Sequence, residues 1–472
     1  MTRTAPLDID AFRRDLGDIP VEDNPKLVLQ KSRDFYWYSP VLKRQLDHVT
    51  ADLVVTPRTI DDVVTTLASA HRHGVPVTPR GAGTGNYGQA MPLSGGAVLN
   101  LAGLTKVVAS SPMTVRAEAG AILARIDEET RAAHGAEMRF HPSTYRTATI
   151  GGFVAGGSGG VGSIRWGGLR NFGNIISLKV VTCEASPRIL DIEGTDILKV
   201  AHAYGTNGII VEAEVPLTAG YDWVDVLAGF DTIEDAVRFA RNVALQDGML
   251  LKEIAPIAAP VPHDYFVRHQ KFIRKDQSVV VMMAAPQAMA ALSIFLAHEK
   301  GEMLYRSDAA SEEDLKRLPP AYELAWNHTT LRGLKVDPSI TYLQTQYPDL
   351  ETLKKIIALL GDEMPMHNEM IRFDGRVVFS GLPIVRFSTE ERLEEIIRIH
   401  EDNGCLVFNP HRYTLEEGGM KRSDPGQLAF KREADPKGIL NPGKMIAWEN
   451  PDFDFASGKA WLFSGLQSAG AD

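Results

Sequence analysis

A short glycine-rich segment contains the first residues whose types and spacing suggest chemistry. It reads Arg80-Gly81-Ala82-Gly83-Thr84-Gly85-Asn86 and follows residues 74–79, an apolar stretch typical of a short strand. Glycine adopts positive φ at little cost and has no β-carbon, so a ligand can approach this backbone closely. Successive N–H groups in such a loop form a concave anion site, and Arg80 adds a planar set of donors. The segment predicts a phosphate-binding loop, and a turn that only connects strands is the alternative.

Two later segments point to the same kind of ligand. Seven of the twelve residues from Gly151 to Gly162 are glycine, a composition that a packed helix or strand tolerates poorly. We therefore expect an irregular backbone there, wrapped against a large flat ligand. Residues 205–212 read as a turn that leads into a buried strand. The candidate ligand-binding residues in and around these segments are Pro142, Ser143, Thr149, Gly151, Gly152, Gly156, Gly157, Ser158, Gly208, Ile209 and Ile210.

Together the three segments indicate one extended dinucleotide lying along a domain. The pattern is not the usual Rossmann fingerprint, because Tyr87 and Gly88 stand where a helix should begin. In addition, no acidic residue ends a second strand about 20 residues further on. We therefore expect a flavin dinucleotide held by loops rather than by the dipole of a helix.

With residues 54–63, 149–152 and 435–444, these motifs resemble the vanillyl-alcohol oxidase / para-cresol methylhydroxylase family of FAD enzymes. The similarity is greatest to the branch of glycolate oxidase subunits and D-lactate dehydrogenases. The resemblance implies an α+β fold, in which a two-subdomain FAD-binding domain is joined to a cap domain. The cap would hold a large antiparallel sheet flanked by helices in ferredoxin-like repeats. It also implies that Asn441 lies at the cofactor.

The departures from the family concern the flavin link and a metal. Many relatives attach FAD covalently through a histidine in the loop that here spans residues 82–86, which contains none, so non-covalent FAD is expected. Lactate and hydroxyglutarate relatives carry a histidine-ending glycine loop and a Glu-His-Gly triplet that supply metal contacts. This chain has neither, so no metal is expected. His367, Glu369 and His411 are the alternative ligand set.

The candidate catalytic residues are His411, Tyr342 and Arg412. Oxidation of an alcohol by a flavin requires that a base take the hydroxyl proton, and a histidine has a suitable pKa. Arg412 could bind a carboxylate or polarise an oxygen, and a structural role for His411 is the alternative. The candidate substrate-binding residues are Gln344, Tyr347, Tyr413 and Asn409.

The sequence also predicts where the candidate substrate-binding residues and two further polar segments lie. Tyr342 and Gln344 are expected on one face of a cap strand, with Tyr347 beyond its end. The segments 326–328 and 367–369 are weaker candidates, which we interpret as solvated turns.

Three segments must position these residues. Residues 1–220 are predicted to form the FAD-binding domain, with its core at 47–220, and residues 221–425 the cap. Residues 426–472 are predicted to return to the first domain. In the cap, four apolar strands are each followed by a helix, which favours an antiparallel sheet with helices on one face. Thr59 is predicted to cap a helix over residues 61–73.

Composition excludes several classes of protein. The chain has 472 residues and a net charge of −10, which disfavours nucleic acid as a partner. Two cysteines cannot build a disulfide framework and suit the cytoplasm. No transmembrane helix is expected, since proline and polar residues interrupt the most apolar stretch, 279–297. A homodimer is compatible with this composition.

These observations favour an FAD-dependent oxidoreductase that acts on a CH–OH group of a small molecule, either a hydroxy acid or an alcohol. One alternative substrate class is a phenolic alcohol, an amine or a lactone. Another alternative is a flavin-carrying subunit of a larger electron-transfer complex. The sequence does not specify the electron acceptor.

Overall fold

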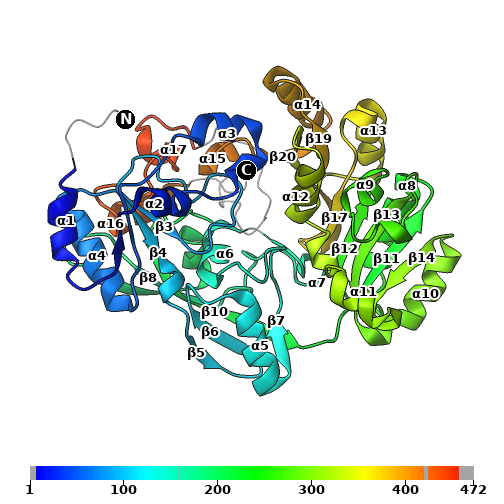
Figure 1. Ribbon diagram of the computed structural model, residues 1–472, viewed down its shortest axis with the longest axis horizontal. Coiled ribbons are helices and arrows are strands. Elements are labelled where there is room, and N and C mark those ends of the chain that lie inside the picture. Colours follow the sequence, from blue (N-terminus) through cyan, green and yellow to red (C-terminus); the bar gives the residue numbers. More distant parts are fainter. Residues whose placement is uncertain (1–6, 158, 419–423, 456–472) are drawn as a thin grey trace.

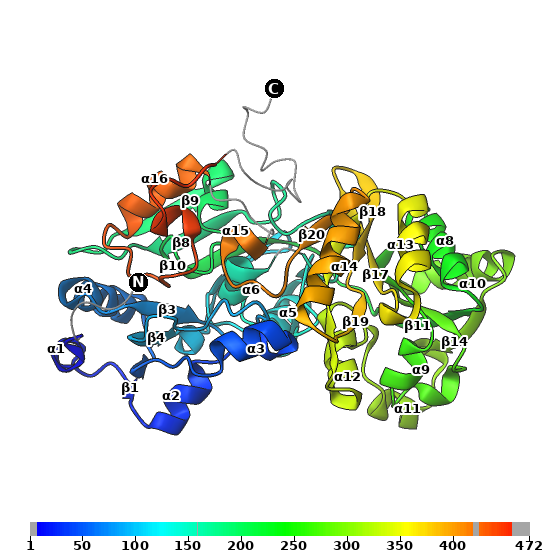
Figure 2. The same cartoon turned by 90° about the horizontal axis from the view of Figure 1, so that it is seen from above.

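The computed structural model describes residues 7–157, 159–418 and 424–455, and its elements form two lobes (Figure 1). The first lobe combines the N-terminal elements with the C-terminal helices, and the second holds the elements between them. The turned view separates the same two groups of elements (Figure 2). This combination of helices with mostly antiparallel sheets confirms the predicted α+β fold class.

Two sheets form the first lobe. One has the order β1-β2-β4-β3, in which β2, β4 and β3 run parallel, and the other is antiparallel with the order β5-β6-β10-β8-β9. A further strand, β7, pairs with β10. The strands are β1 (Val21–Glu22), β2 (Leu53–Val55), β3 (Val77–Arg80), β4 (Ala97–Asn100), β5 (Val107–Ser110), β6 (Thr114–Glu118), β7 (Ala136–Met138), β8 (Ser177–Val181), β9 (Ile189–Glu193) and β10 (Ile209–Ala219).

Local signals set the ends of the longest helix in this lobe. The Thr59 side chain and Asp62 form a capping box at its start, and Gly74 ends it with φ 65°. This confirms the predicted helix. The helices of the first lobe are α1 (Ile9–Asp15), α2 (Pro25–Lys31), α3 (Pro40–Leu46), α4 (Ile60–His73), α5 (Leu123–His134), α6 (Ile150–Gly156), α15 (Leu415–Gly418), α16 (Pro425–Ala434) and α17 (Ile446–Glu449). A further helix, α7 (Ser163–Trp166), follows α6 and packs Ile164 into the core of the cap.

The cap contains two four-stranded antiparallel sheets and one strand pair. The sheet orders are β12-β13-β11-β14 and β17-β18-β16-β20, and β15 pairs with β19. Ile257 and His367 form a bridge between the two sheets. The strands are β11 (Val224–Phe230), β12 (Leu251–Ile257), β13 (Ser278–Ala284), β14 (Glu302–Arg306), β15 (Ile340–Tyr342), β16 (Gln344–Tyr347), β17 (Asn368–Phe373), β18 (Arg376–Gly381), β19 (Ile384–Arg386) and β20 (Leu406–Phe408).

Helices cover both faces of the cap sheets. The four predicted helices share one apolar core with the sheets, whereas α9 and the segments around α12 belong to a second core. The expectation of helices on one face is therefore incomplete, because the opposite face is also apolar and needs a cover. The helices are α8 (Ile233–Ala244), α9 (Val261–Tyr265), α10 (Met289–His298), α11 (Glu312–Arg317), α12 (Asn327–Val336), α13 (Leu350–Leu360) and α14 (Glu390–Asp402).

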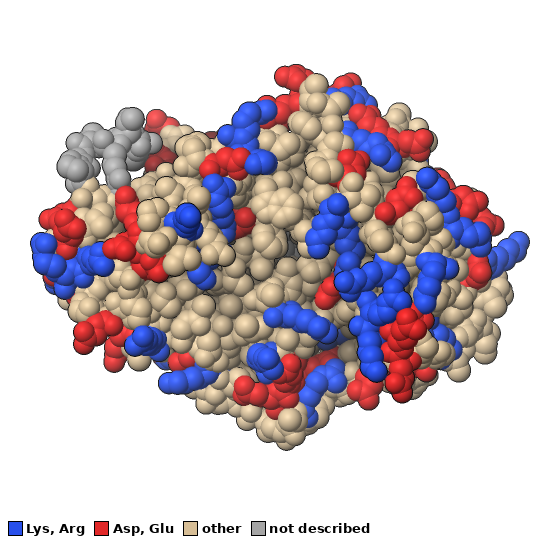
Figure 3. All heavy atoms as spheres, viewed as in Figure 1, with Lys and Arg blue, Asp and Glu red and all other residues tan. Residues whose placement is uncertain are grey.

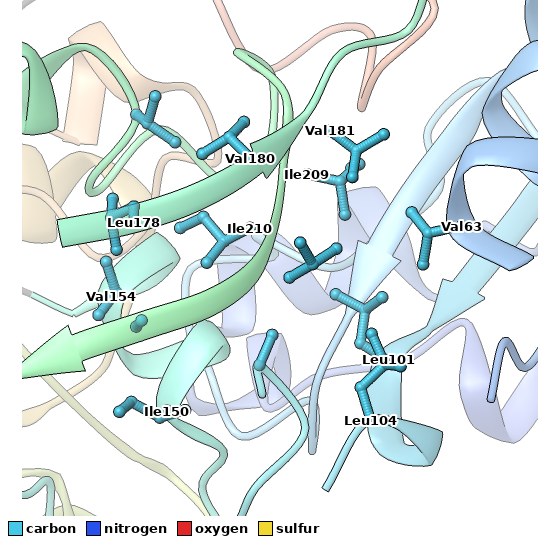
Figure 4. Packing of buried hydrophobic residues seen from close by; sticks show 14 of the residues in the cluster. Val63, Leu101, Leu104, Ile150, Val154, Leu178, Val180, Val181, Ile209 and Ile210 are labelled. Atoms are coloured by element: carbon cyan, nitrogen blue, oxygen red, sulfur yellow. The ribbon is translucent and has the colours of Figure 1, made fainter. Parts of the chain in front are cut away.

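The core of the first lobe joins its two sheets. Side chains of β8 and β10 converge with Val63 of α4 and with Leu101 and Leu104 (Figure 4). Leu440 belongs to the same core and bridges to Val77, so the C-terminal segment contacts the strand that precedes the glycine loop.

The surface carries charges of both signs. Acidic and basic side chains are interspersed over the face seen in Figure 3. Within the described residues, no helix is both long and apolar enough to cross a bilayer.

Candidate functional site

A cleft extends from the glycine loop to the cap. The first lobe supplies most of its wall, including Asp34, Phe35 and Tyr38 from the N-terminal segment. The predicted cofactor-binding residues that line it are Arg80, Gly81, Ala82, Gly83, Thr84, Gly85, Asn86, Pro142, Ser143, Thr149, Gly151, Gly152, Gly156, Gly157, Ile209 and Ile210. Gly208 and Asn441 lie outside the lining, and Ser158 lies outside the described residues.

Arg80 holds the glycine loop rather than projecting freely into the cleft. Its guanidinium donates to the backbone oxygens of Ala82 and Arg33. Gly83 has φ 70°, and a β-carbon there would overlap the Arg80 guanidinium. Only glycine therefore fits this turn, and the loop presents bare backbone to the cleft.

The second glycine segment begins as a helix, which corrects the expectation of an irregular backbone. The Thr149 hydroxyl caps α6 by accepting from the Gly152 N–H at 3.3 Å. A β-carbon on Gly151 would lie 2.5 Å from the Ala119 β-carbon, so this glycine permits close packing of α6 on its neighbour. At Gly156 the nearest atom to a β-carbon would be 3.9 Å away, so this position faces open space in the cleft.

The cap contributes four lining residues, Trp326, Asn327, His328 and Gln344. The first three surround the start of α12 and were interpreted from sequence as a solvated turn. No sequence motif identifies these three residues as part of a site, because their position at the cleft depends on how the two lobes pack together.

Two buried carboxylates hold Trp326 in place. Its indole N–H donates to Glu253 at 2.8 Å, and its backbone N–H donates to Glu369 at 2.6 Å. Trp326 has φ 51°, an uncommon conformation for a bulky residue. Burial raises the pKa of both carboxyl groups. The uncommon backbone conformation of Trp326 is therefore stabilised by hydrogen bonds to two buried carboxyl groups.

His328 is the histidine of the cap that faces the cleft. Among the described residues, its ring has no hydrogen-bond partner. Burial, with the nearby Arg332 charge, lowers the pKa of His328 to about 4, so the ring is neutral at pH 7. A neutral imidazole in this position can accept a proton from a ligand.

His411 does not line the cleft, and both of its ring nitrogens have partners. Nδ1 lies 2.7 Å from the Ser39 hydroxyl, and Nε2 lies 3.0 Å from the Tyr342 backbone oxygen. Since a carbonyl oxygen can only accept, Nε2 donates and Nδ1 accepts from Ser39. Burial lowers the pKa of His411 to about 3, so the ring is neutral and links the N-terminal segment to the cap.

The other residues predicted around His411 face different partners. Arg412 forms an ion pair with Glu394 at 3.1 Å, and the Lys444 ammonium lies over the Tyr413 ring. The Asn409 side chain accepts from the His411 N–H, and Tyr347 is buried beside His400. None of these four residues lines the cleft.

A group of phenols stands at the cap end of the cleft. Tyr38, Tyr87 and Tyr204 line it, and the Tyr87 hydroxyl donates to the Gln344 side chain. The Tyr342 ring meets Tyr38 edge-on at 6.1 Å, and its buried hydroxyl has no hydrogen-bond partner in the described chain. Burial raises the pKa of Tyr342 well above its usual value, so it remains a phenol.

Tyr342 and Gln344 do not share one strand as predicted. β15 ends at Tyr342 and β16 begins at Gln344, so Tyr342 pairs with β19 whereas Gln344 pairs with β20. Of these two residues, Gln344 alone lines the cleft.

Asp34 is a charged lining residue that the sequence motifs did not indicate. Its carboxylate accepts from the backbone N–H groups of Tyr36 and Ala90. Burial raises the pKa of Asp34 and lowers that of Lys444, whose ammonium donates to the Gly88 oxygen. Through these hydrogen bonds, the segment that follows the glycine loop contacts both the N-terminal and the C-terminal segments of the chain.

The alternative metal ligands do not converge. His367 contacts Glu369 at 2.8 Å, whereas His411 is bonded to Ser39. In the part of the chain that the structure describes, no group of three or more His, Cys, Asp and Glu side chains is arranged to hold a metal.

The cleft fits FAD in its chemistry. Arg80 shapes a loop of bare backbone N–H groups suited to a diphosphate, and Gly156 leaves room that a β-carbon would reduce. Ile209 and Ile210 add an apolar surface on which a flat ring can lie.

Comparison with known proteins agrees with this reading. A family model described as FAD binding domain matches residues 51–190. D-lactate dehydrogenase of Archaeoglobus fulgidus is 32% identical over 204 residues, which cover 41% of this chain and 44% of that protein. Glycolate oxidase subunit GlcD of Bacillus subtilis is 24% identical over 437 residues, covering 84% of this chain and 89% of that one. The chain thus spans less than half the length of the first relative and most of the second.

A solved structure extends the likeness to the whole fold. Alkyldihydroxyacetonephosphate synthase superposes with a TM-score of 0.72 at 15% identity, covering 94% of this chain and 86% of that one. This likeness concerns the fold alone. Residues 51–190 are an FAD-binding domain, and the chain is similar to FAD-linked dehydrogenases and oxidase subunits.

Proposed function

We propose that the protein oxidises a CH–OH group of a small molecule that binds at the cap end of the cleft. The observation that carries this proposal is the meeting of the bare-backbone FAD wall with a cap wall that presents His328. FAD, when bound, supplies the oxidant that takes up the hydride. Relatives named for D-lactate, glycolate and D-2-hydroxyglutarate support a hydroxyl-bearing substrate.

The chain's own residues would orient the substrate and move one proton. We propose that a ring nitrogen of His328 accepts the hydroxyl proton, because the ring is neutral and faces the cleft. Gln344 is fixed by the Tyr87 hydroxyl and would orient the substrate oxygen. Trp326 would form one apolar wall and reduce the access of water.

A phenolic alcohol is a second candidate substrate. The specific observation in its favour is the set of phenols that line the cleft, Tyr38, Tyr87 and Tyr204. Aromatic rings offer edge-to-face contacts to an aromatic substrate, and phenol hydroxyls offer hydrogen bonds to its oxygen. A hydroxy acid would instead require a partner for its carboxylate.

The experiment that separates these candidates is anaerobic reduction of the purified flavoprotein. Bleaching of the flavin by a hydroxy acid would support the first substrate class, and bleaching by a phenolic alcohol the second. A protein whose flavin is bleached only in the presence of other subunits would be an electron-transfer component instead.

FAD is expected to be bound without a covalent link. The motive is the glycine loop, which lacks the histidine that holds the flavin in many relatives. Acid precipitation should therefore leave a yellow supernatant and a colourless pellet. A yellow pellet whose protein mass has increased by one flavin would contradict this, and His202 and His328, which line the cleft, would be the first residues to map.

Turnover is expected to survive removal of divalent metals. The chain lacks both metal-binding motifs of the hydroxy-acid relatives, and both ring nitrogens of His411 are bonded, to Ser39 and to the Tyr342 oxygen. Dialysis against a chelator should leave the rate of flavin reduction unchanged. Loss of that rate, restored by zinc or manganese, would refute the expectation and direct attention to His367 and Glu369.

A further inference from the structure

Gln89 lies in the cleft between the two glycine segments, and no motif marks it. Its side chain lines the cleft and is partly buried. A β-carbon on Gly85 would overlap Oε1 of Gln89, and a β-carbon on Gly156 would lie 3.9 Å from Nε2. One side-chain amide therefore lies beside both segments that are predicted to hold the cofactor.

The orientation of this amide is fixed by a backbone hydrogen bond. Oε1 of Gln89 accepts from the Tyr87 N–H at 2.9 Å. Because that oxygen is occupied, Nε2 is the end left to donate, on the side of Gly156. Among the hydrogen bonds of the described residues, none uses Nε2 of Gln89 as a donor.

The backbone of Gln89 is held as firmly as its side chain. The Asn441 side-chain amide donates to the Gln89 oxygen at 2.9 Å and to the Tyr204 oxygen at 2.7 Å. Asn441 does not line the cleft, so it supports the site through Gln89 and Tyr204. A donor fixed at both ends loses little conformational entropy when it binds a ligand.

We propose that Nε2 of Gln89 donates a hydrogen bond to a phosphate oxygen of the FAD diphosphate. The guanidinium of Arg80 gives two of its N–H groups to the backbone oxygens of Ala82 and Arg33, and the Gln89 amide adds another side-chain donor beside the loop. A hydrogen bond to a charged acceptor is stronger than one between neutral groups. Gln89 thus joins the loop and α6 through the cofactor.

The proposal is tested by comparing Q89A with Q89E in the binding of FAD and of ADP, which shares the diphosphate but lacks the flavin. Glutamate keeps the acceptor for the Tyr87 N–H, loses the donor and adds a negative charge. The exposed Gln287 of the cap provides matched controls, Q287A and Q287E. Dissociation constants and the melting temperature of the apoprotein are measured for each variant.

Q89A is expected to weaken both ligands by about 10–100-fold, the range for a hydrogen bond to a charged group. Q89E should bind more weakly than Q89A, while the controls bind as the unaltered protein does. If Q89E instead restores binding relative to Q89A, the residue only supports Tyr87 and the proposal is wrong. Should Q89E fail to fold, Q89K decides: binding tighter than Q89A supports the proposal, and binding as weak as Q89A overturns it.

Discussion

Leucine in place of Gly156 is expected to weaken FAD binding strongly while the apoprotein keeps its fold. A β-carbon there would meet no atom closer than 3.9 Å, so the new side chain extends into the cleft rather than into the protein. Overlap with a bound ligand costs at least as much as overpacking of a core, about 1–3 kcal/mol, which alone corresponds to about 5–150-fold in affinity. We expect a loss at the upper end of this range or beyond it.

Titration of the apoprotein with FAD, together with its melting temperature, checks this result. The control is G248L in a cap turn, where a β-carbon would meet nothing within 4 Å. G151L is unsuitable, because its side chain would strike Ala119 and disturb the packing of α6. Full flavin occupancy in G156L would mean that the cofactor does not pass along this part of the cleft.

Alanine in place of His328 is expected to slow flavin reduction by about 10²–10⁴, the contribution of a well-placed general base. The pKa of His328 is lowered to about 4, so the neutral ring prevails above that pH. In the unaltered protein the rate should therefore be constant near neutrality and fall as the pH approaches 4. H328A should retain FAD and lose this acid limb.

H411A is the matched comparison, since it removes a buried histidine that has both nitrogens bonded. Its loss removes the acceptor of the Ser39 hydroxyl, which still accepts from the Leu42 N–H, and removes the His411 donor from the Tyr342 oxygen. A buried polar group that loses its partner lowers stability by about 1–3 kcal/mol. We expect a lower melting temperature and a smaller effect on the rate than in H328A. A rate loss confined to H411A would restore His411 as the base and contradict the assignment of His328.

Local sequence signals were sufficient for several elements. Thr59 and Gly74 delimit α4 through contacts within the helix itself, so sequence alone places both ends. The glycines that follow Arg80 also predict a tight loop, because the positive φ of Gly83 is a local property of the backbone. The alternation of strands and helices in the cap could likewise be predicted from the spacing of the apolar residues and from the lengths of the apolar segments.

Other features depend on contacts between distant residues. Glycine in α6 is explained by the approach of Ala119, which no local pattern reveals, and the sequence therefore suggested an irregular segment. Which histidine faces the cleft depends on how the lobes meet: Ser39 is hydrogen-bonded to His411, whereas the partly buried His328 lines the cleft. The separation of Tyr342 and Gln344 into two strands likewise depends on distant partners, because β15 pairs with β19 and β16 pairs with β20.

The most direct test of the proposed function is anaerobic mixing of the FAD-loaded protein with a panel of hydroxyl compounds. The panel holds glycolate, D-lactate, D-2-hydroxyglutarate, aliphatic and phenolic alcohols, a lactone and an amine. We predict that one hydroxyl compound bleaches the visible flavin absorbance, and that deuterium on its carbinol carbon slows the bleaching. A flavin that dithionite bleaches but no member of the panel reduces would contradict the assignment of this protein as an oxidase or dehydrogenase of CH–OH groups.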